Sequence, residues 1–257
     1  MSNLLKISNL SKRFGGLAAV NGLSFHVDDN EIVGLIGPNG AGKTTAVNLI
    51  SGLIAPSGGE VHFNNEEITH LRPSQLAGKG LVRTFQHTAL YAECTVFENA
   101  RRGTYLRRYP GFLRSLFPTG ACREKTKIAD DEAMSLLELF GLDKNRDTIA
   151  GSMPYGYQKV LGIVLALAAR PRLILLDEPV AGLSAEETDS VRDVILRIRS
   201  EGISVVVIEH NMRFISSLCD RVVVVNAGET LAEGTPQEVL RDKRVIEAYL
   251  GADHDTA

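Results

Sequence analysis

The chain has 257 residues, of which 44% are hydrophobic and 23% are charged, and its net charge is −3. These values predict one large folded domain with a sizeable core. They argue against a dedicated nucleic-acid-binding protein, which usually carries a basic excess. The three cysteines, Cys94, Cys122 and Cys219, lie far apart, so neither a disulfide framework nor a zinc site is expected.

The first residues lack the apolar core of a signal peptide, and no apolar run approaches the roughly 18 residues of a membrane span. Free cysteines suit a reducing cytoplasm. We therefore expect a soluble protein that reaches a membrane only through a partner.

Apolar and polar residues alternate up to about Val27, which predicts antiparallel strands at the N-terminus. Four later runs rich in branched apolar residues predict strands buried on both faces, as in a parallel sheet. These runs span residues 33–36, 173–176, 205–208 and 222–225. Helical patterns cover residues 44–51, 130–140, 158–170 and 185–200. Strands that alternate with helices predict an α/β fold.

Residues 87–155 carry helical patterns and no convincing strand, which predicts an inserted helical lobe. We expect a single domain, in which residues 1–86 and 158–257 form the core with an N-terminal β-subdomain and residues 87–157 form the helical part. Arginines and aromatics mix over residues 100–127. This mixture fits either a docking surface or a solvated loop, and the second is the more common origin of charge runs.

The segment GPNGAGKTT follows the first buried strand and opens a helix, which is the setting of a P-loop. Its glycines let successive backbone N–H groups wrap phosphates, and the helix N-terminus adds positive potential. Lys43 is expected to reach the β- and γ-phosphates, and the Thr44 hydroxyl to bind Mg²⁺. The expected nucleotide-binding residues here are Gly37, Pro38, Asn39, Gly40, Ala41, Gly42, Lys43, Thr44 and Thr45.

The run LILLDEP places Asp177 and Glu178 at the end of a buried strand. Asp177 can hold Mg²⁺ and Glu178 can polarise an attacking water. Two carboxylates without a neighbouring lysine or arginine are costly in a purely structural site. With a P-loop upstream, the pair therefore predicts nucleotide hydrolysis, although the same residues also fit a strand-to-turn junction ending at Pro179.

His210 follows the apolar run ISVVVIE, and such a histidine is usually structural or exposed. In a parallel sheet, however, the strand ends share one edge with the P-loop, where a histidine can touch the γ-phosphate. Neither Gln86 nor Phe14 can be assigned a role from the residue type and its neighbours alone. Phe14 is an ordinary aromatic residue unless it stacks on a base.

In chain order, Phe14, GPNGAGKTT, Gln86, LILLDEP and His210 resemble the ATP-binding cassette (ABC) family over nearly the whole chain. The resemblance implies a P-loop NTPase core, ATP and Mg²⁺ as cofactors, and a dimer that holds ATP between one cassette's P-loop and the other's signature. It implies that Phe14 stacks on adenine, and that Gln86 contacts Mg²⁺ and the attacking water. It also makes Glu178 the general base and His210 the switch histidine.

Within the family, the segments RFGGLAAVNGLSF, LVRTFQHTALYAECTVFENA and VIEAYLGA look most like the ATP-binding subunit of branched-chain amino-acid importers. Urea and amide importers are close behind, and the lipopolysaccharide-export cassette ends in a similar YLG stretch. This likeness implies a sister ATPase, two permease subunits and a solute-binding protein as partners, without nucleic acid. It places the chain peripherally on the cytoplasmic side of the inner membrane.

Two other functions stay open from the sequence. A soluble cassette of repair or translation usually shows paired cassettes, coiled coils or basic extensions, and none is present. A regulator that binds nucleotide without hydrolysing it would not need the intact Glu178 and His210.

The family signature L-S-G-G-Q aligns with residues 153–157, which read MPYGY. Pro154 has neither a hydroxyl nor an N–H, so the bond from the signature serine to the opposite γ-phosphate is lost. Such a bond is worth about 1.5–3 kcal/mol. Tyr155, Gly156 and the N-terminus of a helix starting near Gln158 can still attract phosphate.

The altered signature predicts a heterodimer in which a sister cassette supplies a full signature over this chain's ATP. The alternative is that Pro154 is a tolerated proline at the first helical position and that both sites work alike. Ser184 stands where the family commonly has an aspartate.

Overall fold

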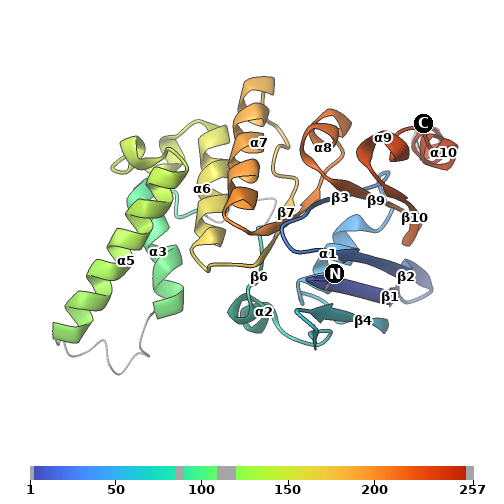
Figure 1. Cartoon of the computed structure of the whole chain (residues 1–257), viewed down its shortest axis with the longest axis horizontal. Coiled ribbons are helices and arrows are strands. Elements are labelled where there is room, and N and C mark those ends of the chain that lie inside the picture. Colours follow the sequence, from blue (N-terminus) through green and yellow to red (C-terminus); the bar gives the residue numbers. More distant parts are fainter. Residues whose placement is uncertain (1–2, 85–89, 109–119, 253–257) are drawn as a thin grey trace.

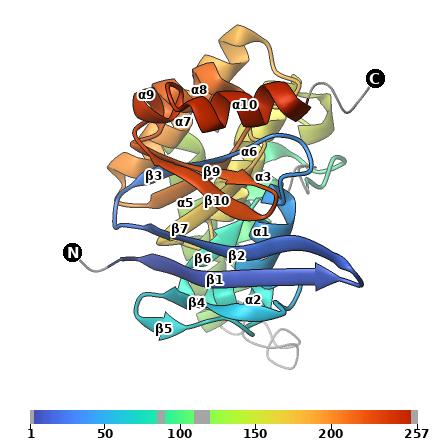
Figure 2. The same ribbon diagram turned by 90° about the vertical axis from the view of Figure 1, so that its right-hand side faces the viewer.

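The computed structural model describes residues 3–84, 90–108 and 120–252. Two β-sheets lie next to each other, and most of the helices lie on one side of them (Figures 1 and 2). The four-stranded antiparallel sheet runs β2-β1-β4-β5, with strands Leu17–Val27, Leu5–Phe14, Gly58–Phe63 and Glu66–Glu67. The six-stranded sheet runs β10-β9-β3-β8-β7-β6, with strands Glu229–Gly234, Arg221–Asn226, Ile32–Ile36, Ser204–Ile208, Leu173–Asp177 and Leu81–Arg83.

The helices of the described residues begin with α1 (Lys43–Ile50), α2 (Pro73–Lys79), α3 (Val96–Arg108) and α5 (Gly120–Leu139). They continue with α6 (Tyr155–Leu167), α7 (Ala185–Ser200), α8 (Met212–Leu218), α9 (Pro236–Val239) and α10 (Lys243–Ala252). Two short 3₁₀ turns, η1 (Asp143–Asn145) and η2 (Ala150–Ser152), precede α6. No helix among these residues is long and apolar enough to cross a membrane.

The core lies on both faces of the six-stranded sheet. Every residue of β3, β7 and β8 is buried, as the branched apolar runs predict. Alternate side chains of each strand point to opposite faces. One set packs with α1 and the antiparallel sheet, and the other set packs with α6, α7 and α8. The α/β fold with an antiparallel N-terminal sheet is therefore confirmed.

The six-stranded sheet is mostly parallel, again as expected. β9, β3, β8, β7 and β6 pair in parallel, and only β10 runs antiparallel to its neighbour β9. Because of this pairing, the carboxyl ends of β3, β7 and β8 meet at one edge.

The helical lobe is present, and α3 and α5 lie at the end of the molecule away from the antiparallel sheet (Figure 1). The α5 helix starts at Gly120, ten residues before the predicted start at Asp130. The segment 100–127, for which the sequence favours a solvated loop, is helical at residues 100–108 and 120–127, and its remaining residues lie outside the described part. Polar and charged residues are compatible with an amphipathic helix that packs on one face only, which is why the loop prediction was wrong here.

The start of α6 also differs from the prediction. The helix begins at Tyr155 rather than near Gln158, and Pro154 is its N-cap residue with φ −53° and ψ 147°. Proline favours an extended residue before it, and Met153 is extended with φ −74° and ψ 152°. Pro154 thus precedes the first helical residue instead of occupying it.

Candidate functional site

The P-loop, the two carboxylates and the histidine are brought together at one edge of the sheet. The P-loop follows β3, Asp177 ends β7, and His210 comes two residues after β8. Parallel pairing of β3 with β8 and of β8 with β7 places these three strand ends side by side. This edge is where open α/β sheets bind ligands.

The P-loop backbone requires glycine at two positions. Gly37 has φ 152°, and a Cβ there would lie 2.0 Å from the carbonyl oxygen of Val225. Gly42 has φ 99°, and a Cβ there would lie 2.4 Å from the carbonyl oxygen of Ala19. The loop can therefore pack tightly against the neighbouring strands only because both side chains are absent.

Lys43 is the first residue of α1, and its side chain contacts this loop. Its Nζ donates to the carbonyl oxygens of Gly37 at 2.7 Å and Pro38 at 2.9 Å. Burial lowers the pKa of Lys43, while the negative charge of Glu178 acts in the opposite direction. The positive charge of Lys43 can attract a phosphate group, and the carboxylate of Glu178 lies close enough to interact with that charge.

Replacement of Lys43 by alanine is expected to weaken ATP binding about 10- to 150-fold, since a hydrogen bond to a charged group contributes about 1.5–3 kcal/mol. Titration of the purified chain with a fluorescent ATP analogue measures this change. The exposed Lys144→Ala variant is the matched control and should bind as the unaltered chain does. An unchanged affinity of Lys43→Ala would contradict the P-loop assignment.

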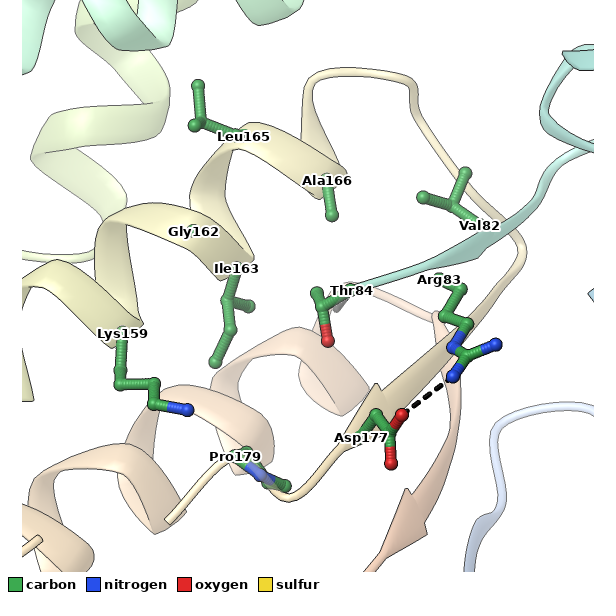
Figure 3. Close-up of a pocket in the computed structure, with 10 residues that line it drawn as sticks. All are labelled: Val82, Arg83, Thr84, Lys159, Gly162, Ile163, Leu165, Ala166, Asp177 and Pro179. Carbon is green, nitrogen blue, oxygen red and sulfur yellow. Dashed lines mark hydrogen bonds and ion pairs between the residues drawn. The ribbon is translucent and has the colours of Figure 1, made fainter. Parts of the chain in front are cut away.

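Asp177 has a cationic partner that the sequence did not indicate. The Arg83 guanidinium of β6 donates to Asp177 Oδ2 at 2.7 Å, and the two side chains are 7% and 11% exposed (Figure 3). Arg83 also donates to Asn48 Oδ1 at 2.6 Å and Ser51 Oγ at 3.1 Å, both from the P-loop helix region. The expectation that no arginine stands beside the carboxylates was therefore wrong, because β6 pairs directly with β7.

A cavity of about 190 Å³ lies next to this ion pair, between β6, the end of β7 and α6 (Figure 3). Lys159 reaches into this region from α6 and is only 6% exposed. Its Nζ lies 3.4 Å from the carbonyl oxygen of Glu178. The helix that follows the altered signature thus contacts the turn that carries the expected general base.

Glu178 has an unusual backbone, with φ 48°. Non-glycine residues rarely adopt this region, and they persist in it only where the surroundings determine it. Its N–H donates to the carbonyl oxygen of Ile208 at 2.9 Å, which ties the turn to the end of β8. The surrounding structure therefore holds this turn in a conformation that the residue rarely adopts.

His210 has a side chain that is 65% exposed, so it is accessible to a ligand at the sheet edge. The residue before it, Glu209, is a buried carboxylate that the sequence prediction missed. Burying a charged residue at the end of an apolar strand costs free energy unless the residue is hydrogen-bonded. The position of Glu209 directly after such a strand could therefore have indicated a hydrogen-bonded carboxylate.

The signature region carries a second missed carboxylate. Gly156 N–H donates to Glu187 Oε1 at 3.1 Å, and Ser184 N–H donates to Glu187 Oε2 at 2.9 Å. Hydrogen bonds from Ser184, and a further one from Gly156, hold the pKa of Glu187 below its usual value. In this structure, an N–H expected to face phosphate is therefore bonded within the chain. Ser184 itself caps α7, which is a local use for serine at this position.

The remaining expected residues are placed as follows. Phe14 ends β1 with half of its surface exposed, and Lys12 Nζ lies 5.2 Å from its ring centroid. Thr44 is exposed at the start of α1, and Tyr155 is partly exposed at the start of α6. Gln86 lies outside the described residues. The free thiols of Cys94 and Cys219 are as expected.

The chain matches two known family models. A family model described as ABC transporter matches residues 20–181, which is more than half of the chain. The chain belongs to the ABC transporter family. As a member it is an ATP-hydrolysing cassette, and its predicted fold and family are confirmed. A second model, described as branched-chain amino acid ATP-binding cassette transporter, matches residues 229–255, from β10 onward.

Individual relatives are similar over nearly their full length. The branched-chain amino acid transport ATP-binding protein BraF of Pseudomonas aeruginosa is 42% identical, over 96% of this chain and 98% of its own. The Escherichia coli K12 protein LivG, of the same description, is 39% identical over the same shares. The lipopolysaccharide export ATP-binding protein LptB of Haemophilus influenzae is 33% identical, over 97% of this chain and 98% of its own.

Solved structures show the same fold. The ADP conformation of MJ1267, an ATP-binding cassette of an ABC transporter, superposes with a TM-score of 0.86 at 32% identity and covers 98% of this chain and 100% of its own. A nucleotide-free ATP-binding cassette superposes with a TM-score of 0.84 at 31% identity, over 96% and 98%.

Proposed function

We propose that this cassette is the ATPase subunit of an importer for branched-chain or other hydrophobic amino acids. The observation that carries the proposal is the match of residues 229–255 to a model described as branched-chain amino acid ATP-binding cassette transporter. The higher identity to BraF than to LptB, 42% against 33%, supports the importer over the lipopolysaccharide exporter.

In the proposed ATPase cycle, Phe14 stacks on adenine and the P-loop with Lys43 holds the phosphates. Glu178 takes a proton from the attacking water, and His210 contacts the γ-phosphate from the end of β8. Both lie at the edge where β3, β7 and β8 end. Gln86 has the role that the family resemblance implies.

Mg²⁺ fits the residues at this edge. Thr44 offers a hydroxyl and Asp177 a carboxylate, and such hard oxygen ligands suit a cation that is held mainly by waters and phosphates. The described residues contain no group of three or more His, Cys, Asp or Glu side chains that could hold a metal ion. The ion would neutralise the developing phosphate charge.

The proposed partners are two permease subunits, a solute-binding protein and a sister cassette, and the chain acts at the cytoplasmic membrane surface. The permease partners are supported by the likeness to ATP-binding subunits of branched-chain amino acid transport. We also propose that residues 87–157 act as one helical subdomain on a core of residues 1–86 and 158–257.

Affinity purification from detergent-solubilised membranes tests the function. Recovery of two permeases together with a second cassette supports an importer complex. Recovery of the chain only from the soluble fraction, or with nucleic acid attached, would refute the transport proposal. Recovery with lipopolysaccharide-export components would favour the exporter instead.

We further propose that the two ATP sites of the dimer are unequal. Pro154 provides no hydroxyl, and the N–H of Gly156 is bonded to Glu187. A site built with this signature should therefore bind the opposite phosphate more weakly than a site with a full signature.

With Glu178→Gln in this chain, ATP-dependent dimers with the sister cassette are expected to form at lower ATP concentration than homodimers. Size-exclusion chromatography of the mixed and separate chains measures this difference. Equal formation of both dimers would contradict the unequal sites and favour the alternative in which Pro154 is tolerated.

A further inference from the structure

Glu209 is a carboxylate buried between two parts of the candidate site. It follows β8 directly and is only 1% exposed. Its Oε1 accepts the N–H of Val180 at 3.0 Å, and its Oε2 accepts the N–H of His210 at 3.1 Å. One side chain therefore joins the turn after β7 to the histidine after β8.

The turn that Glu209 holds is the one that carries Glu178. Val180 lies two residues after Glu178, whose own N–H donates to Ile208 at 2.9 Å. One main-chain bond and one carboxylate thus attach this turn to the end of β8. Because Glu178 is held at φ 48°, its orientation depends on such attachments.

A carboxylate in this place has a cost. Burial raises the pKa of Glu209, and the hydrogen bonds from Val180 and His210 act against that rise. A neutral side chain could fill the same space with a smaller loss of hydration free energy. The two carboxylate oxygens offset part of this cost, because they accept one N–H from each side of the site.

We propose that Glu209 is a positioning residue, which sets the placement of the Glu178 turn relative to His210 during ATP hydrolysis. This inference rests on the proposed roles of Glu178 and His210. It requires no contact between Glu209 and nucleotide.

The Glu209→Gln variant of the full chain tests the inference. Glutamine keeps one accepting oxygen but turns an amide donor toward the N–H of Val180 or of His210, so one bond is lost. We expect kcat to fall about tenfold or more, with KM and the affinity for a fluorescent ATP analogue within about twofold. The P-loop is not altered, which is why binding should persist.

Two variants complete the experiment. Glu209→Asp keeps the charge but is one methylene shorter, and it should give an intermediate kcat with unchanged nucleotide affinity. Glu238→Gln is the matched control, because Glu238 also accepts a backbone N–H, from Thr235 at 2.8 Å, but at the start of α9. Its kcat should equal that of the unaltered chain.

Three outcomes would overturn the inference. If Glu209→Gln keeps a kcat within twofold of the unaltered chain while Glu178→Gln is inactive, the positioning role of Glu209 is refuted and the role of Glu178 stands. An equal loss of nucleotide affinity and kcat in both Glu209 variants means that the carboxylate is only structural. Normal turnover by Glu178→Gln refutes the proposed role of Glu178 itself, and with it the premise.

Discussion

Replacing Glu178 with glutamine is expected to lower the rate of ATP hydrolysis by about 10²- to 10⁴-fold, the usual contribution of a general base. ATP binding should be retained, because glutamine keeps the size of the side chain and removes only its ability to take a proton. The electrostatic interaction between Lys43 and Glu178 places this carboxylate beside the P-loop. Phosphate release measured with saturating ATP and Mg²⁺ checks the rate, and titration with an ATP analogue checks the binding.

The exposed Glu201→Gln variant is a matched control for the loss of one carboxylate, and it should keep its full rate. If Glu178→Gln hydrolysed ATP at a rate near that of the unaltered chain, another group would have to be the base. His210, whose side chain is exposed at the same edge, would then be the first residue to test.

Replacing Arg83 with methionine is expected to lower the free energy of unfolding by about 3–5 kcal/mol, the usual result of breaking a buried ion pair from one side. The substitution leaves the Asp177 carboxylate, 11% exposed, without its guanidinium. It also removes the hydrogen bonds that Arg83 donates to Asn48 and Ser51. The contact that Arg83 makes between β6, β7 and the α1 region is then lost. Urea unfolding followed by circular dichroism measures the change.

Arg172→Met is the matched control for this change. Arg172 pairs with Asp29 at 2.8 Å, but the two side chains are 47% and 57% exposed. Exposed pairs contribute about 0–1 kcal/mol, so this variant should unfold almost as the unaltered chain does. If both substitutions lowered the free energy of unfolding equally, burial would not be the reason why the Arg83–Asp177 pair stabilises the fold.

Several parts of the fold follow from local pattern. The P-loop could be located because GPNGAGKTT must follow a strand and open a helix, and β3 and α1 flank it as predicted. The four predicted parallel strands are present because branched apolar runs are stable where both faces are buried. Placing Asp177 and Glu178 near the P-loop needed only the rule that parallel strands end at one edge.

Helix ends were less predictable. The start of α6 at Tyr155 is determined by the proline at its N-cap, whereas apolar periodicity becomes clear only from Gln158 onward. The helical lobe was predicted, but the start of α5 at Gly120 was placed ten residues too late, because the first half of this helix is rich in polar and charged residues.

By itself, the sequence determined the nucleotide-binding loop, the parallel strands and the family, because each depends on neighbouring residues or on a short period. Only the tertiary structure decided which charges stand together at the site. Arg83 meets Asp177 across 94 positions, and Glu187 reaches Gly156 across 31. Such contacts depend on which strands and helices lie side by side, and no local pattern contains that information.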